Sequence, residues 1–165
     1  MALNASTTLP YDTATVLGVL TDEGFVRHMS EYVGGKLESL TLDGDPAGAF
    51  TLTAVRTLPT QRLPEMARKF VGETLSVTQT EHWGAPQADG SREATLDMTV
   101  AGVPLTVAAV QRLVAQGTDT VVELQGNVTS SIPFLGGKIA STAELMIGKA
   151  LNVQAAEARK WLESR

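Results

Sequence analysis

The chain contains no cysteine, and this absence excludes several kinds of chemistry at once. It has no disulfide, no thiolate nucleophile, no iron–sulfur cluster and no cysteine-bound zinc. Its histidines number only two, His28 on a predicted helix and His82 on the outer face of a predicted strand. Zinc normally takes three or four converging ligands, and a Ser-His-Asp triad needs a histidine beside its serine. We therefore expect no metal site and no cofactor.

Clusters of positive charge and long apolar runs are also missing. The net charge is −5, and basic residues are mixed with acidic ones along the chain. Nucleic-acid binding normally depends on clustered lysine and arginine, so no nucleic-acid partner is predicted. No window approaches the ~18 consecutive apolar residues that span a bilayer. The first residues, MALNASTTLP, do not resemble a secretory signal, and we expect a cytoplasmic protein.

Alternating apolar and polar residues predict a sheet of seven strands. Residues 2–9 form the first strand, and two short helices follow, one capped near Asp12 and one ending at Gly34-Gly35. Six further strands are expected at residues 36–42, 49–58, 74–83, 92–101 and 103–116, and from about 119 to near Ser131. Hairpin signals such as Asp43-Gly44-Asp45-Pro46 separate them.

The last part of the chain predicts one long amphipathic helix. From Gly137 to about Ser164 there is no proline, and apolar residues recur at helical spacing. Roughly 28 residues at 1.5 Å each give a helix on the order of 40 Å long. Such a helix must bury its apolar face elsewhere. We therefore predict an α+β protein in which a curved antiparallel sheet grips the C-terminal helix, with residues 1–165 forming a single domain.

This order of elements resembles the helix-grip superfamily of START-like and Bet v 1-like proteins (SRPBCC). Three stretches, LTDEGFVRHMSEYVGG, LPEMARKFVGETLSVTQTEHW and IPFLGGKIA, are similar to an uncharacterised actinobacterial family, domain of unknown function 2505. The resemblance spans nearly the whole chain and implies the fold and an internal cavity. It implies no catalytic residues.

Several polar residues fall on the apolar, inward-facing side of the predicted strands. Arg56, Gln79, Glu81 and Gln111 interrupt otherwise apolar faces, and helical spacing places Gln154 and Glu157 beside Met146, Ala150 and Trp161. We expect a ligand-binding cavity lined by Arg56, Val77, Glu81, Trp83, Leu96, Met98, Val107, Gln111, Leu124, Met146, Ala150, Gln154 and Glu157.

Two interpretations of these polar residues remain open. In the first they are structural, and Arg56 pairs with Glu81 or Glu157, because a buried charge is costly unless it is paired. In the second they line an amphiphilic pocket and orient a ligand that has an apolar body and a polar end. The two overlap, since a wet cavity can hold an ion pair.

The segment TQRLPEMARKFVGE between the second and third of the six strands predicts a short helix. Leu63, Met66 and Phe70 share one of its faces. This face either caps one end of the structure or forms a gate to the cavity. The helix is too short and too weakly charged for stable membrane anchoring.

These patterns favour non-covalent binding of a small hydrophobic or amphiphilic molecule, such as a lipid, an isoprenoid or a polyketide. Two alternatives remain. Glu81 or Glu157 in an apolar pocket could serve as acid or base in a cyclase- or dehydratase-like enzyme. The chain could also be a structural or protein-interaction module with a filled core.

Overall fold

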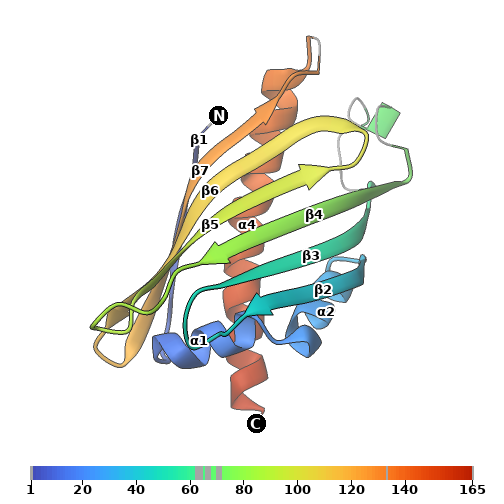
Figure 1. Cartoon of the computed structure of the whole chain (residues 1–165). Coiled ribbons are helices and arrows are strands. Elements are labelled where there is room, and N and C mark those ends of the chain that lie inside the picture. The colour runs from blue at the N-terminus through green and yellow to red at the C-terminus, as the bar shows by residue number, and fades with distance from the viewer. Residues whose placement is uncertain (1, 62–64, 66–67, 70–71, 133, 165) are drawn as a thin grey trace.

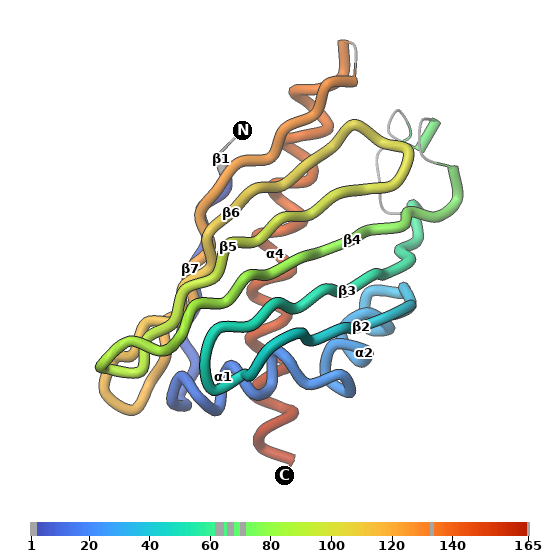
Figure 2. The backbone as a smooth tube through the Cα atoms, in the orientation of Figure 1, coloured from blue at the N-terminus to red at the C-terminus, as the bar shows by residue number. Residues whose placement is uncertain are grey.

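The computed structural model describes residues 2–61, 65, 68–69, 72–132 and 134–164. Its described strands form one antiparallel sheet in the order β1-β7-β6-β5-β4-β3-β2. The sheet is strongly curved, and one long helix, α4, crosses it from end to end (Figure 1). The short helices α1 and α2 lie near the C-terminal end of α4 (Figure 2), where α1 contacts β6 and β7 and α2 contacts β2. This is the predicted helix-grip architecture.

The elements have the following bounds. The sheet consists of β1 (Ala2–Leu9), β2 (Lys36–Gly44), β3 (Phe50–Pro59), β4 (Thr74–Trp83), β5 (Arg92–Val100), β6 (Val103–Gln116) and β7 (Asp119–Ser130). The helices are α1 (Thr13–Leu20), α2 (Glu23–Tyr32) and α4 (Gly136–Glu163). The predicted gate residues Leu63, Met66 and Phe70 lie outside the described residues. In the described part of the chain, no helix is long and apolar enough to cross a membrane.

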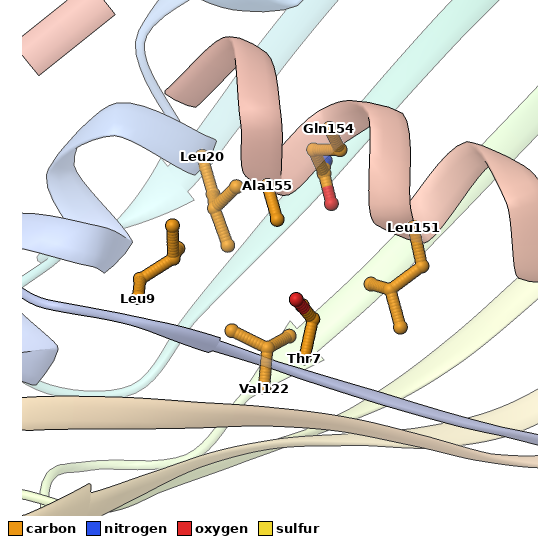
Figure 3. A pocket seen from close by; sticks show the side chains of 7 residues that line it. All are labelled: Thr7, Leu9, Leu20, Val122, Leu151, Gln154 and Ala155. Atoms are coloured by element: carbon orange, nitrogen blue, oxygen red, sulfur yellow. The ribbon is translucent and has the colours of Figure 1, made fainter. Parts of the chain in front are cut away.

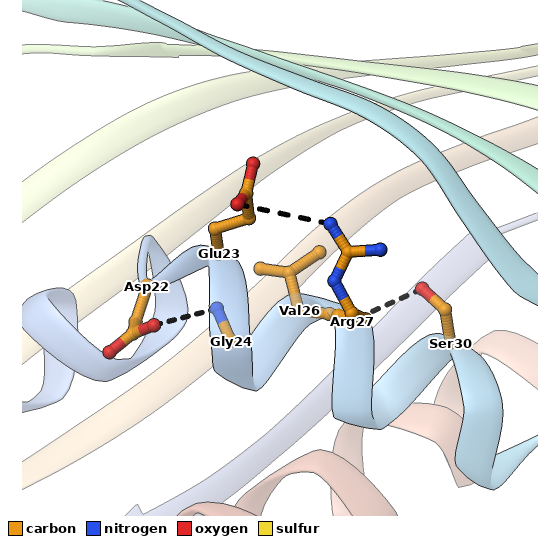
Figure 4. A network of polar contacts seen from close by, with 6 residues as sticks. All are labelled: Asp22, Glu23, Gly24, Val26, Arg27 and Ser30. Carbon is orange, nitrogen blue, oxygen red and sulfur yellow. Dashed lines mark hydrogen bonds and ion pairs between the residues drawn. The ribbon is translucent and has the colours of Figure 1, made fainter.

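Aspartates begin both short helices. Asp12 accepts a hydrogen bond from the backbone N–H of Thr15 at 2.8 Å, and Asp22 accepts one from Gly24 at 2.7 Å. Such caps satisfy N–H groups that have no partner within the helix. Along α2, the Ser30 hydroxyl donates to the Val26 carbonyl at 2.9 Å, as Figure 4 shows. This bond holds Ser30 on the buried side of α2, where it meets the sheet.

The strand pairing confirms the predicted inward faces. Leu52 of β3 lies opposite Glu81 of β4, Ala54 lies opposite Gln79, and Arg56 lies opposite Val77. Because side chains on directly paired residues point to the same side, the polar residues share one face with apolar neighbours. The core on this face is formed mainly by Phe50, Leu52, Trp83, Ala94, Leu96, Val107, Leu113, Val122, Leu124 and Val128.

One side of α4 packs mainly against β1 and β7. Its buried residues are Ala140, Leu151, Ala155, Glu157 and Ala158. The expectation that Met146 and Ala150 face the interior is wrong, because both are exposed, Met146 by 42%. At 100° per residue, Met146 and Ala150 lie roughly 100–140° around the helix axis from the buried Leu151. This side of α4 is not the one that packs against β1 and β7. Helical spacing alone predicted one apolar stripe, whereas α4 carries a narrower buried stripe next to exposed apolar residues.

Candidate functional site

A chain of polar side chains crosses the inner face of β3 and β4. The Arg56 guanidinium donates from Nη1 to Gln79 Oε1 at 2.8 Å and from Nε to the Ser30 hydroxyl at 3.2 Å. Gln79 Nε2 in turn donates to Glu81 Oε2. The Trp83 indole donates to the other carboxyl oxygen, Oε1, at 2.8 Å. We call Arg56, Gln79, Glu81 and Trp83 the polar relay.

Burial controls the protonation of the two ionisable groups in the relay. Glu81 is only 8% exposed, and loss of hydration raises the pKa of its carboxyl above the ordinary value. Hydrogen bonds from Trp83 and Gln79 and the charge of Arg56 oppose this rise. Loss of hydration also lowers the pKa of Arg56, against the charge of Glu81. Burial therefore disfavours the charged form of both groups, and the charge of each group partly offsets this effect on the other.

The Arg56 side chain keeps unused hydrogen-bond donors. It is partly exposed, and its Nη2 group has no hydrogen-bond partner among the described residues. Both oxygens of Glu81 are already acceptors, and the Gln79 amide is engaged at its oxygen and its nitrogen. At this place the inner face thus offers free donors on Arg56, while each Glu81 oxygen already accepts one hydrogen bond.

Gln111 of β6 is a second polar residue on the inner face. It is 6% exposed and lies between Ala94 of β5 and Leu124 of β7. No hydrogen bond to its side chain forms within the described ranges of the chain. Its amide atoms are not among the fully enclosed polar atoms that lack a partner, so they keep some contact with solvent that a water or a ligand can use. Gln111 is therefore a candidate contact for a bound molecule.

A small cavity lies between α4, α1 and the strands β1 and β7 (Figure 3). Its volume is ≈ 10 Å³, and it is lined by Thr7, Leu9, Leu20, Val122, Leu151, Gln154 and Ala155. A space of about 10–15 Å³ holds one water at most. Gln154, predicted to line the ligand cavity, is partly buried at this small cavity.

A second hollow, of ≈ 450 Å³, lies on β1, β6 and β7 and is open to solvent. It is lined by Leu3, Asn4, Val110, Arg112, Gln125, Gly126 and Asn127. Most of these residues belong to the polar, outward side of the strands, and Arg112 there already pairs with Glu93 at 2.8 Å. This hollow is separate from the polar relay.

Glu157 does not join the polar relay. Its carboxylate contacts His28 Nε2 of α2 at 2.9 Å and Lys160 Nζ at 3.2 Å. The hydrogen bonds from His28 and Lys160 lower the pKa of this carboxyl. Glu157 therefore lies between α4 and α2. Of the two partners expected for Arg56, only Glu81 is near, and it is reached through Gln79.

The remaining predicted cavity residues fall on the inner face. Val77, Trp83, Leu96, Val107 and Leu124 are buried, and Met98 is partly buried. Whether any of them contacts a ligand stays a prediction. Their shared orientation follows from the two-residue period of the strands.

Two sets of contacts, those of Arg92 and that between His28 and Glu157, were not predicted from the sequence. Arg92 is 6% exposed and donates to the carbonyls of Pro46, Gly48 and Gly84 at 2.5–3.2 Å. The same alternation that places Ala94 and Leu96 inward places Arg92 inward, so a signal was present. The His28–Glu157 contact had no signal, because it joins residues 129 positions apart.

Several crystal structures share this architecture. A protein from Thermus thermophilus (TTHA0849) is 13% identical, with a TM-score of 0.59, and the match covers 98% of this chain and 99% of that one. Zhui aromatase/cyclase from Streptomyces is 12% identical, with a TM-score of 0.56 and coverage of 98% and 95%. Norcoclaurine synthase from Thalictrum flavum is 14% identical, with a TM-score of 0.55 and coverage of 100% and 87%.

At these identities the likeness establishes the fold alone, which is the helix-grip fold of START-like and Bet v 1-like proteins. Residues 4–162 match the family described as protein of unknown function (DUF2505). The chain therefore belongs to this family, as its sequence motifs predicted. No curated protein matches the chain in sequence.

Proposed function

We propose that the chain binds a small hydrophobic or amphiphilic molecule, non-covalently, between the inner face of the sheet and α4. The polar relay is the observation that carries this proposal. Arg56 keeps free donors on a face that is otherwise apolar, and a core built only for stability has no need of such a group. A ligand with an apolar body and a polar end makes use of both features.

Partly exposed apolar residues support the same proposal. Met29 of α2, Met98 of β5, Leu105 of β6 and Ile147 of α4 pack against the core and keep part of their surface accessible. Covering apolar surface contributes about 25 cal/mol per Å², before the cost of ordering the ligand. Apolar contact would supply most of the affinity, and the relay would orient the ligand.

Catalysis by a carboxylate is a weaker alternative. The raised pKa of Glu81 suits a group that holds a proton, and two proteins of this fold are by name an aromatase/cyclase and a synthase. However, both oxygens of Glu81 accept hydrogen bonds, from Trp83 and Gln79, and these bonds lower its pKa and so oppose the form that holds a proton. Glu157 has a lowered pKa and contacts His28 of α2, so it suits the role of a proton-holding group less well than Glu81.

A structural or interaction module with a filled core is the third possibility. It predicts that no small molecule accompanies the protein and that space-filling substitutions on the inner face change nothing but stability. The binding experiment separates it from the first proposal.

Binding is tested with a matched pair of helix variants. Ile147→Trp adds volume on the partly buried side of α4, and Leu145→Trp adds the same volume at a residue that is 67% exposed. The full chain is titrated with a fluorescent apolar probe, 1-anilinonaphthalene-8-sulfonate, and examined by native mass spectrometry for a retained small molecule. We expect Ile147→Trp to weaken binding about tenfold, the equivalent of ~1.4 kcal/mol.

The control Leu145→Trp should bind as the wild type does. Equal loss in both variants would place the probe on the surface of α4 and contradict an interior site. No probe binding to the wild type, together with an apo mass from native mass spectrometry, would favour the structural module.

A further inference from the structure

We infer that the ligand is an acidic amphiphile whose carboxylate is received by the free N–H groups of Arg56. This inference rests on the proposed function and names the chemistry of the ligand's polar end. It follows from which hydrogen-bonding groups of the inner face are already used and which are left.

Arg56 is a cation without a direct counter-ion. The described part of the chain contains no ion pair between Arg56 and a carboxylate, and the nearest negative group, Glu81, is reached through the neutral Gln79 amide. The guanidinium is held in place from two sides, by Ser30 of α2 and by Gln79 of β4. A fixed guanidinium with free N–H groups is suited to a planar carboxylate, which it can bind through two parallel hydrogen bonds.

The relay also disfavours other head groups. A ligand alcohol or amine also donates, and the acceptors of the relay, the Glu81 oxygens and the Gln79 oxygen, already accept one hydrogen bond each. An ammonium group would in addition be repelled by Arg56. An ester offers acceptors but carries no charge, so it lacks the Coulomb attraction that a carboxylate gains from the Arg56 guanidinium.

Arg92, the other arginine on the inward side of the strands, cannot serve in this way. Its guanidinium is occupied by three backbone carbonyls and lies over the Phe50 ring, with 5.5 Å between its carbon and the ring centroid. Its bonds fix the loops at one end of the sheet. Gln111, by contrast, lies on the same face without a hydrogen-bond partner among the described residues, and its amide atoms keep some contact with solvent.

The experiment compares two probes that differ only in charge, cis-parinaric acid and its methyl ester, both titrated by fluorescence at about pH 8. In the wild type we expect the acid to bind about tenfold more tightly than the ester, as one charge-assisted contact predicts. In Arg56→Gln the two probes should bind equally, within about twofold. Arg27→Gln, which removes an exposed guanidinium from α2, is the matched control, and it should keep the preference for the acid.

Arg56→Lys guards against a variant that does not fold. Lysine keeps the charge and loses the fork of donors, so the acid preference should fall but persist. Equal binding of acid and ester to the wild type, or an acid preference that survives in Arg56→Gln, would overturn the inference and leave interior binding intact. If neither probe binds to the wild type, the proposed function falls together with it.

Discussion

Glu81 is a carboxyl group that the fold places among Leu52, Leu96 and Trp83. Its burial costs hydration, and two hydrogen bonds and the indirect charge of Arg56 return only part of that cost. A group in this position makes the stability of the folded chain depend on pH. The direction of the effect follows from the direction of its pKa shift.

Replacement of Glu81 by glutamine should flatten this dependence. In the folded chain the pKa of Glu81 is raised above its ordinary value of 4.5, so the folded state holds the proton more tightly than the unfolded state. The stabilisation is complete below pH ~4.5 and is lost as pH rises through the folded pKa. Urea unfolding at several pH values should therefore show the wild type losing stability relative to Glu81→Gln as pH increases. An unchanged difference across that range would contradict a buried, proton-holding Glu81.

At the scale of elements, the close approach of β6 and β7 depends on Gly126. A Cβ at this position would lie 2.2 Å from the Ala108 carbonyl oxygen and 2.5 Å from the Ala109 Cα, both on β6. The backbone cannot yield there without a shift of the paired strands. Gly126 thus permits the close pairing of β7 with β6.

Two glycine substitutions should have opposite effects on the free energy of unfolding. Gly126→Ala forces backbone atoms apart and should cost about 1–3 kcal/mol or more, as overpacking does. Gly148, within α4, has open space around its Cβ position, so Gly148→Ala should stabilise the chain by about 1 kcal/mol through helix propensity. Both are measured by urea unfolding monitored by circular dichroism. A neutral Gly126→Ala would mean that β6 and β7 separate easily.

At the scale of the whole molecule, a polar contact ties the two ends of the chain together. His28 of α2 meets Glu157 of α4, and the rings of Phe25 and Trp161 pack edge-to-face beside them at 5.6 Å. The N-terminal helices and the C-terminal helix are thereby held at one end of the sheet. Because Glu157 is a buried, ionisable residue of α4, the stability of this contact between α2 and α4 depends on pH.

Acid should weaken the His28–Glu157 contact and lower the stability of the wild type. The variant Glu157→Gln should not show this loss of stability. Bonds from His28 and Lys160 lower the folded pKa of Glu157 below its ordinary value of 4.5. The stabilisation is present above pH ~4.5 and is lost as pH falls through the lowered pKa. Unfolding between about pH 3 and 7 should show that the wild type loses its advantage over Glu157→Gln in acid. Glu163→Gln, on the exposed last turn of α4, should follow the wild type throughout.

Much of the fold and part of the site were predictable from the sequence. There is a physical reason why the remaining features were not. Alternation in the strands is a local property, so the residue pattern alone identified the common face of Arg56, Gln79 and Glu81. The buried face of α4 was harder to predict, because this helix carries apolar residues on more than one side. Met146 and Ala150 were placed inward on spacing alone, while the sheet covers the side that holds Leu151 and Ala155.

The sequence by itself determined the elements, their order and the apolar side of each strand, because these depend on residues a few positions apart. Tertiary structure alone decided which partners meet: Arg56 with Ser30 and Gln79, and Glu157 with His28. Such pairings depend on the twist of the sheet and the rotation of α4 about its axis. These arise from packing across the whole chain, and no local pattern records them.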